Sequence, residues 1–224
     1  MPLASSFRNG CALVFVALTF AAPRAQAELV SHHFTGQLTT ITNGSGGLLD
    51  LSGLFTLGQA VTLDYTIERD TPPEAQDAYT SGYTGAITSL AFSIGSWAGT
   101  GTPALSFTTV LDNEPSPGTK PPRTQAGVYD EYSAQVQGGI SAPDIGGSTL
   151  QSLTYTLDDV EGTAFNSTTL PRVFPDLGAF EGKTLTVLLL DLSQFKSGYV
   201  MATFSGVSTR AQPTTWGAVK ASYR

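Results

Sequence analysis

Apolar and polar residues alternate with a period of two along most of this chain, and this alternation limits what the chain can fold into. In residues 61–67 (VTLDYTI) every odd-numbered position is apolar and every even-numbered position is polar. Side chains of an extended strand point alternately to its two faces, so this pattern indicates a strand with one buried and one solvated face. The same pattern places further core residues at Leu90, Phe92 and Ile94; Leu105, Phe107 and Thr109; Tyr132, Ala134 and Val136; Leu153, Tyr155 and Leu157; and Val200, Ala202 and Phe204.

Clusters of Gly, Pro, Asn and Asp separate these segments. They fall at residues 43–47, 70–73, 113–122 and 141–147, and such residues favour turns because Gly permits a positive φ and Pro lacks a ladder donor. Short strands at this spacing predict an all-β fold, an antiparallel β-sandwich of about 8–10 strands with a jelly-roll-like topology and little helix. Residues 170–180 contain Pro171 and Pro175 and are expected to form a loop with at most one helical turn.

The first 27 residues read as an export signal. Arg8 precedes an apolar run at residues 11–22 (CALVFVALTFAA), and Ala25, Gln26 and Ala27 form a small-x-small cleavage motif before Glu28. The run is shorter than the roughly 20 residues of a membrane span. We therefore expect a signal peptide at 1–27, one β-sandwich domain at 28–208, a flexible tail at 209–224, and a secreted or cell-surface protein without a transmembrane anchor.

Charge and cysteine content exclude several classes of function. The chain has 18 acidic and 11 basic residues, and two of the basic ones, Arg8 and Arg24, lie in the signal. An acidic surface without a basic stripe repels phosphate backbones, so nucleic acid is not an expected partner. The only cysteine, Cys11, also lies in the signal, which leaves the mature chain without disulfide or thiolate chemistry.

Several short motifs resemble exported bacterial proteins that carry a Pro-Glu-Pro C-terminal (PEP-CTERM) sorting signal recognised by exosortase. The similar segments are residues 34–36 (FTG), 53–59 (GLFTLGQ), 61–72, 83–90 (YTGAITSL), 92–95 (FSIG), 162–165 (GTAF), 170–171 and 175–177. Residues 212–216 (QPTTW) are similar to the start of the sorting signal and residues 223–224 to its end, but the apolar span between them is missing. The resemblance implies a surface or matrix role without implying catalysis.

Residues that could carry catalysis are sparse. A Ser-His-Asp triad would have to use His32 or His33, and no Gly-x-Ser-x-Gly motif presents a nucleophile. A glycoside hydrolase needs two carboxylates at a suitable distance, and three pairs are candidates: Asp64 with Glu68, Asp158 with Asp159, and Asp130 with Glu131. The two adjacent pairs do not meet this requirement, because neighbouring residues of a strand face opposite ways. Asp64 and Glu68 share a face but lie about 13 Å apart along an extended strand, which is too far. We therefore expect no enzyme, with a glycoside hydrolase as the remaining catalytic alternative.

Two binding sites are candidates. Glu68, Asp70, Glu74 and Asp77 fall within one connection and could supply oxygen ligands to calcium, the one cofactor that the sequence suggests. Five aromatic residues near strand ends could stack on sugar rings if exposed: Tyr79, Tyr83, Trp97, Tyr129 and Tyr132. The sequence thus predicts a non-enzymatic structural or interaction protein of the bacterial envelope or extracellular matrix that presents its loops to extracellular polysaccharide or envelope proteins; the alternative is a carbohydrate-binding module, with or without calcium.

Overall fold

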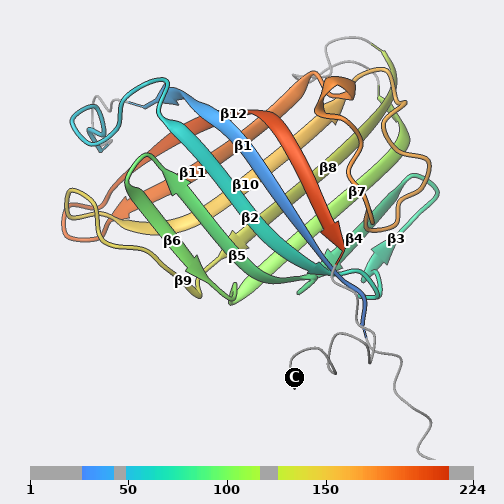
Figure 1. Ribbon diagram of the computed structural model, residues 1–224, viewed down its shortest axis with the longest axis horizontal. Coiled ribbons are helices and arrows are strands. Elements are labelled where there is room, and N and C mark those ends of the chain that lie inside the picture. Colours follow the sequence, from blue (N-terminus) through green and yellow to red (C-terminus); the bar gives the residue numbers. More distant parts are fainter. Residues whose placement is uncertain (1–26, 43–48, 117–125, 212–224) are drawn as a thin grey trace, which may run out of the picture.

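The computed structural model describes residues 27–42, 49–116 and 126–211, and nearly all of them belong to strands or to short connections (Figure 1). The expected signal peptide, up to residue 26, and the expected tail, from residue 212, lie outside the described residues. The strands are β1 (Leu29–Ile41), β2 (Ala60–Glu68), β3 (Ala75–Gln76), β4 (Thr80–Thr84), β5 (Ile87–Ile94), β6 (Trp97–Gly101), β7 (Leu105–Ser116), β8 (Gly127–Gln137), β9 (Ile140–Ser141), β10 (Thr149–Asp159), β11 (Gly182–Asp191) and β12 (Lys196–Ala211). A 3-10 turn, η1 (Leu177–Ala179), confirms the single helical turn expected in residues 170–180.

All twelve strands join one antiparallel sheet in the order β3-β4-β7-β8-β10-β11-β12-β1-β2-β5-β6-β9. The all-β antiparallel prediction is confirmed, but the described strands form one continuous curled sheet rather than the two separate sheets expected of a sandwich. The expected 8–10 strands become twelve, of which β3 and β9 have only two residues each. No helix in the described parts of the chain is long and apolar enough to span a membrane.

Short connections between distant strands explain the curl. Only Gly85 and Ala86 join β4 to β5, although most of the sheet lies between these strands, and the Gly85 N–H donates to the carbonyl of Ser106 in β7 at 2.9 Å. Three residues join β6 to β7, and Gly138 and Gly139 join β8 to β9 in the same way. The two arms of the sheet must therefore approach each other along this edge, which is the lower edge in Figure 1.

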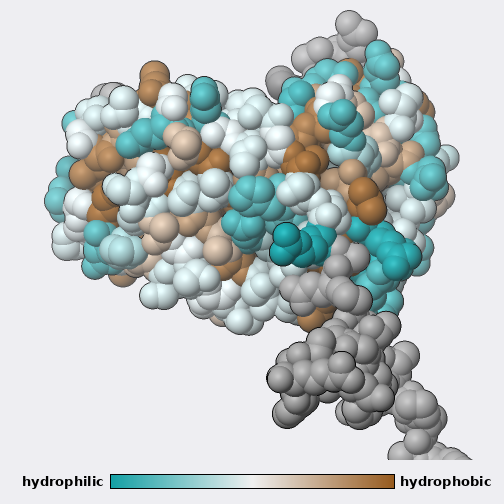
Figure 2. Space-filling model, viewed as in Figure 1, coloured by the Kyte–Doolittle hydropathy of each residue, from teal (hydrophilic) through white to brown (hydrophobic). Residues whose placement is uncertain are grey.

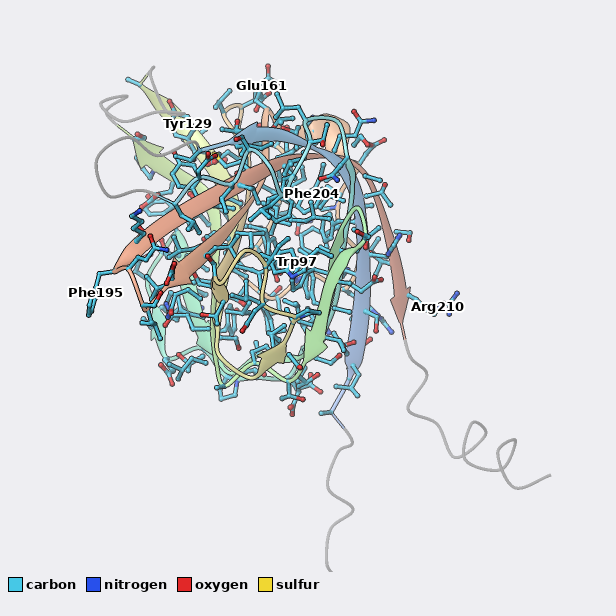
Figure 3. All side chains as sticks on the ribbon, turned by 90° about the vertical axis from the view of Figure 1, so that its left-hand side faces the viewer. Trp97, Tyr129, Glu161, Phe195, Phe204 and Arg210 are labelled. Atoms are coloured by element: carbon cyan, nitrogen blue, oxygen red, sulfur yellow. The ribbon has the colours of Figure 1, made fainter. Side chains whose placement is uncertain are left out.

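The inner face of the curled sheet encloses one core. Residues 61–67 alternate as the sequence predicts, with Val61, Leu63, Tyr65 and Ile67 buried. Phe34 of β1 lies among other rings, with its centroid 5.0 Å from that of Phe204 and 5.5 Å from that of Phe174. Phe174 belongs to residues 160–181, which connect β10 to β11 and which we call the strap. Phe204 points into this interior in Figure 3.

Strand β7 corrects one core prediction. Leu105 and Phe107 are 63% and 47% exposed, whereas Ser106 and Thr108 are buried. Pairing with β8 sets this arrangement, because Ser106 lies opposite Val136 and Thr108 lies opposite Ala134. Directly paired residues share a face, so the apolar inner face of β8 carries the polar residues of β7 inward.

The β-domain also extends beyond its expected end at residue 208. Strand β12 runs to Ala211, and Arg210 and Thr209 pair with Ser31 and His32 of β1. Residues 209–211, expected in a flexible tail, are therefore part of the central sheet.

Candidate functional site

A depression of about 590 Å³ lies on the outer face of the sheet, over β12, β1, β2, β5 and β6. We call it the outer-face hollow, and its outward lining includes Ser31, His33, Asp64, Thr66, Ser208 and Arg210. Figure 2 shows this face as mostly white with a hydrophilic patch where β1, β2 and β12 run side by side. Alternation places these side chains outward, because Val30, His32 and Phe34 between them point into the core.

A short side-chain contact of the hollow joins His33 and Asp64. The two residues lie opposite each other in the β1–β2 pairing, and the imidazole Nδ1 is 2.6 Å from the carboxylate Oδ1. Their side chains are 44% and 53% exposed, so the pair is in contact with solvent. On the other side of β1, Ser208 lies opposite His33. Ser208, His33 and Asp64 thus form a row across three adjacent strands.

A second row lies beside the first. Arg210 of β12 pairs with Ser31 of β1, and Ser31 pairs with Thr66 of β2, the two hydroxyls being 2.9 Å apart. Arg210 extends away from the sheet in Figure 3. The hollow therefore presents a carboxylate, a guanidinium, an imidazole and several hydroxyls on a rigid sheet, a mixture of hydrogen-bond donors and acceptors.

The order Ser208, His33, Asp64 is that of a hydrolytic triad, but its surroundings favour binding over catalysis. A triad needs a hydrogen bond from the serine hydroxyl to the imidazole, and within the described part of the chain no such bond joins Ser208 to His33. The imidazole and carboxylate are also exposed to water, which weakens their electrostatic influence on a reacting group.

The other histidine has the opposite environment. His32 is 1% exposed, its Nδ1 is 3.1 Å from the Thr209 hydroxyl, and its ring meets that of Phe174 edge-on at 4.5 Å. Burial lowers the pKa of His32 from 6.5 to about 3, because a charged imidazole would lose its hydration. This residue is a neutral part of the core near neutral pH.

Three tyrosines continue the interior cluster beside His32. The rings of Tyr65 and Tyr155 are 5.0 Å apart, and those of Tyr132 and Tyr155 are 5.7 Å apart. Burial raises the pKa of all three phenols above the ordinary value, so they remain protonated. Tyr155 donates to the Tyr132 hydroxyl at 3.4 Å. We assign this cluster to packing.

Two buried carboxylates hold the strap. Asp130 and Asp159 lie opposite each other in the β8–β10 pairing and are 0% and 1% exposed. Asp130 accepts from the Phe165 N–H at 2.6 Å and from the Asn113 N–H at 2.8 Å. Asp159 accepts from the backbone N–H groups of Glu161, Thr163 and Ala164.

Their pKa values shift in opposite directions. Burial raises the pKa of Asp130, because its two backbone hydrogen bonds do not outweigh the loss of hydration. Burial also acts to raise the pKa of Asp159, but the hydrogen bonds from residues 161–164 together outweigh it and leave that pKa below its ordinary value. Sequence spacing could not reveal this pair, because the two residues meet only through strand register. Their oxygens accept hydrogen bonds from backbone N–H groups of the strap and of Asn113 in β7, which favours a structural role over a hydrolytic one.

The four predicted calcium ligands do not converge. Glu68 ends β2, Asp70 accepts from the Glu28 N–H, Glu74 accepts from the Thr84 hydroxyl, and Asp77 accepts from the N–H groups of residues 79 and 80. Across the described ranges, no three His, Cys, Asp or Glu side chains gather closely enough to hold a metal ion. The structure therefore gives no support to calcium at these residues.

Four of the five predicted sugar-stacking rings are buried, which corrects their interpretation as exposed. Tyr83, Trp97, Tyr129 and Tyr132 are at most 7% exposed, and only Tyr79, at 44%, faces solvent. Trp97 packs against Phe92 and donates its indole N–H to the Pro143 carbonyl at 2.8 Å (Figure 3). Buried rings fill the core and cannot stack on a sugar from solution.

Sequence reasoning missed the outer-face hollow. Its members come from strands that are distant in the chain, and the only available signal was the polar half of each alternating segment, as in residues 61–67. Comparison with models of protein families, with curated protein sequences and with solved structures found no match to this chain.

Proposed function

We propose that this protein is an exported, non-catalytic interaction protein of the bacterial envelope or extracellular matrix, and that it binds extracellular polysaccharide at the outer-face hollow. The observation that carries this proposal is the grouping of His33, Asp64, Arg210 and the flanking hydroxyls on one face of a rigid sheet. Export is supported by the signal-like first 27 residues.

The chemistry of the hollow suits a ligand rich in hydroxyl groups. A carboxylate such as Asp64 only accepts hydrogen bonds, the Arg210 guanidinium only donates them, and serine and threonine hydroxyls do both. Sugar hydroxyls can satisfy all three kinds of partner at once. Because the backbone is paired in the sheet and the His33–Asp64 and Ser31–Thr66 side chains already contact each other, these two pairs lose less conformational entropy on binding.

The acidic character of the chain favours a neutral polysaccharide over a polyanionic one. The chain carries 18 acidic residues against 11 basic ones, so a polyanionic glycan would meet general repulsion. A neutral polysaccharide avoids this cost and still offers hydroxyls to Asp64 and Arg210. We therefore propose a neutral glycan as the ligand.

An array of neutral and acidic polysaccharides, probed with the exported protein, tests the proposal. Binding to at least one neutral polysaccharide is expected, with affinity reduced about tenfold or more by Asp64→Ala or Arg210→Ala, since a lost charged hydrogen bond costs about 1.5–3 kcal/mol. The control Asp144→Ala removes an exposed acid outside the hollow and should leave affinity unchanged. No binding to any neutral glycan, or equal losses in all three variants, would contradict the proposal.

The contribution of calcium can be separated in the same experiment. Because the predicted ligands Glu68, Asp70, Glu74 and Asp77 do not converge, binding should be the same with and without a chelator. A loss of binding on chelation would instead favour the calcium-dependent carbohydrate-binding alternative.

A further inference from the structure

Glu28 is held through every polar group that it has. Its backbone N–H donates to Asp70 Oδ2 at 3.0 Å, and its carbonyl accepts from the Arg69 N–H at 2.9 Å. Its two carboxylate oxygens accept from Arg69 Nη1 at 3.1 Å and from Arg172 Nε at 2.8 Å. This degree of fixation is unusual at the edge of a fold, where chain ends are mostly loosely held.

The same residue follows the small-x-small motif Ala25-Gln26-Ala27. We propose that the bond between Ala27 and Glu28 is the processing site, and that Asp70 is the receptor for the new α-ammonium group. The inference rests on the export that the proposed function includes, and it adds a maturation site and its docking partner.

The chemical change is a hydrolysis. Water adds across the amide bond, Ala27 leaves with a carboxylate, and Glu28 keeps an amine. An α-amine has an ordinary pKa of about 8, so it takes up a proton at neutral pH. The atom that donates to Asp70 as a neutral amide in the uncut chain thus becomes a cation. Hydrogen bonds between charged partners are about twice as strong as neutral ones.

Glu28 is also connected to the strap through Arg172. Arg172 lies in the strap two residues before Phe174, whose ring covers His32. Glu28 therefore links the start of β1, the turn after β2 and the strap at one point. Cleavage at any other bond would leave extra residues in front of Glu28, or would remove Glu28 itself, and in both cases the ammonium would be displaced from Asp70.

The test exports the full chain from a bacterial host and determines the first residue of the product by N-terminal sequencing. Glu28 is expected. A second precursor carries one extra alanine inserted after Ala27, so that the product begins one residue earlier and the Glu28 nitrogen remains a neutral amide. Asp70→Asn is then introduced into both, and the four thermal midpoints are compared. Asp70 is exposed, so this substitution should fold normally.

In the product that begins at Glu28, Asp70→Asn should lower the midpoint by about 2 °C, as expected for one partly exposed ion pair in a protein of this size. In the extended product the loss should be less than half as large. A different first residue, or equal losses in both products, would overturn the inference while leaving the polysaccharide proposal intact. Retention of the uncleaved chain inside the cell would instead contradict the proposed export.

Discussion

His32 and His33 are neighbours on β1 but occupy opposite faces of the sheet, one in the core against Phe174 and the other on the outer surface with Asp64. They are the only two histidines of the chain. Because side chains of a strand alternate between its two faces, His32 is part of the core and His33 is part of the candidate binding site.

The buried histidine should make stability depend on pH. Its pKa is 6.5 when unfolded and about 3 when folded, so below pH 6.5 the unfolded chain binds a proton that the folded protein does not. The free energy of unfolding should therefore fall by about 2.5 kcal/mol between pH 7 and pH 4.5 through this group. Urea unfolding at a series of pH values measures this slope.

Two variants isolate the source of that slope. His32→Phe should flatten it whatever its effect on absolute stability, because no titrating group remains at this place. Thr209→Val, which removes the hydroxyl beside the His32 imidazole but no titrating group, should leave a slope of the same sign. An unchanged slope in the His32 variant would show that other groups cause the acid sensitivity.

Asp159 should contribute strongly to stability through the strap. Asp159→Asn weakens several charged hydrogen bonds from residues 161–164, and we expect a loss of about 2–4 kcal/mol in the free energy of unfolding. Because its folded pKa is lowered, the contribution is present above the ordinary value near 3.8 and is lost as pH falls through the folded pKa. Asp77→Asn is the control, since exposed Asp77 also accepts two backbone N–H groups, and it should cost less than about 1 kcal/mol. Similar losses in both variants would contradict this role of burial.

The corner between β8 and β9 should tolerate no side chain at Gly139. Its φ is +72°, and an added Cβ would collide with the Thr102 carbonyl. Gly139→Ala should cost about 3 kcal/mol or more, whereas Gly147→Ala, which has a positive φ but open space, should cost about 1–2 kcal/mol. Gly53→Ala, with neither constraint, should change stability by less than about 0.5 kcal/mol. Chemical denaturation ranks the three, and equal losses would mean that the corner is not fixed by this contact.

A fluorophosphonate probe distinguishes binding from hydrolysis at Ser208. Such probes label a serine that is activated by a base and an oxyanion site, and among the described residues no hydrogen bond joins the Ser208 hydroxyl to the His33 imidazole. The native protein should remain unlabelled under conditions in which an added serine hydrolase reacts fully. Labelling that disappears in Ser208→Ala and in Asp64→Asn would show that the protein is an enzyme.

The sequence predicts the faces of most strands because burial follows alternation. The odd-numbered residues of the segment 61–67 and the core positions in β5, β8, β10 and β12 are buried as expected. The continuous apolar run at residues 187–190 also follows strand alternation, with Val187 and Leu189 buried and Leu188 and Leu190 half-buried. In β7 the expected buried and exposed residues are exchanged, because the register with β8 turns Ser106 and Thr108 inward and leaves Leu105 and Phe107 exposed.

Features that depend on which distant strands pair cannot be predicted from the hydrophobic periodicity of the sequence. The curl of the sheet depends on which strands the two-residue connections at Gly85 and Gly138 bring together, and local pattern does not encode this. The pairing of Asp130 with Asp159 and the alignment of Ser208, His33 and Asp64 likewise arise only from register. Tyr83, Trp97, Tyr129 and Tyr132 are expected as exposed rings near strand ends, but the curl of the sheet buries them, and only Tyr79 of this group is exposed.

Mapping the binding surface by NMR tests the central claim most directly. Titration of the ¹⁵N-labelled protein with a fragment of a neutral polysaccharide that binds on the array should shift the amide signals of Ser31, His33, Asp64 and Ser208, and leave those of the strap unchanged. Shifts confined to the strap or to the loops at the strand ends, with none in β1, β2 and β12, would contradict binding at the outer-face hollow.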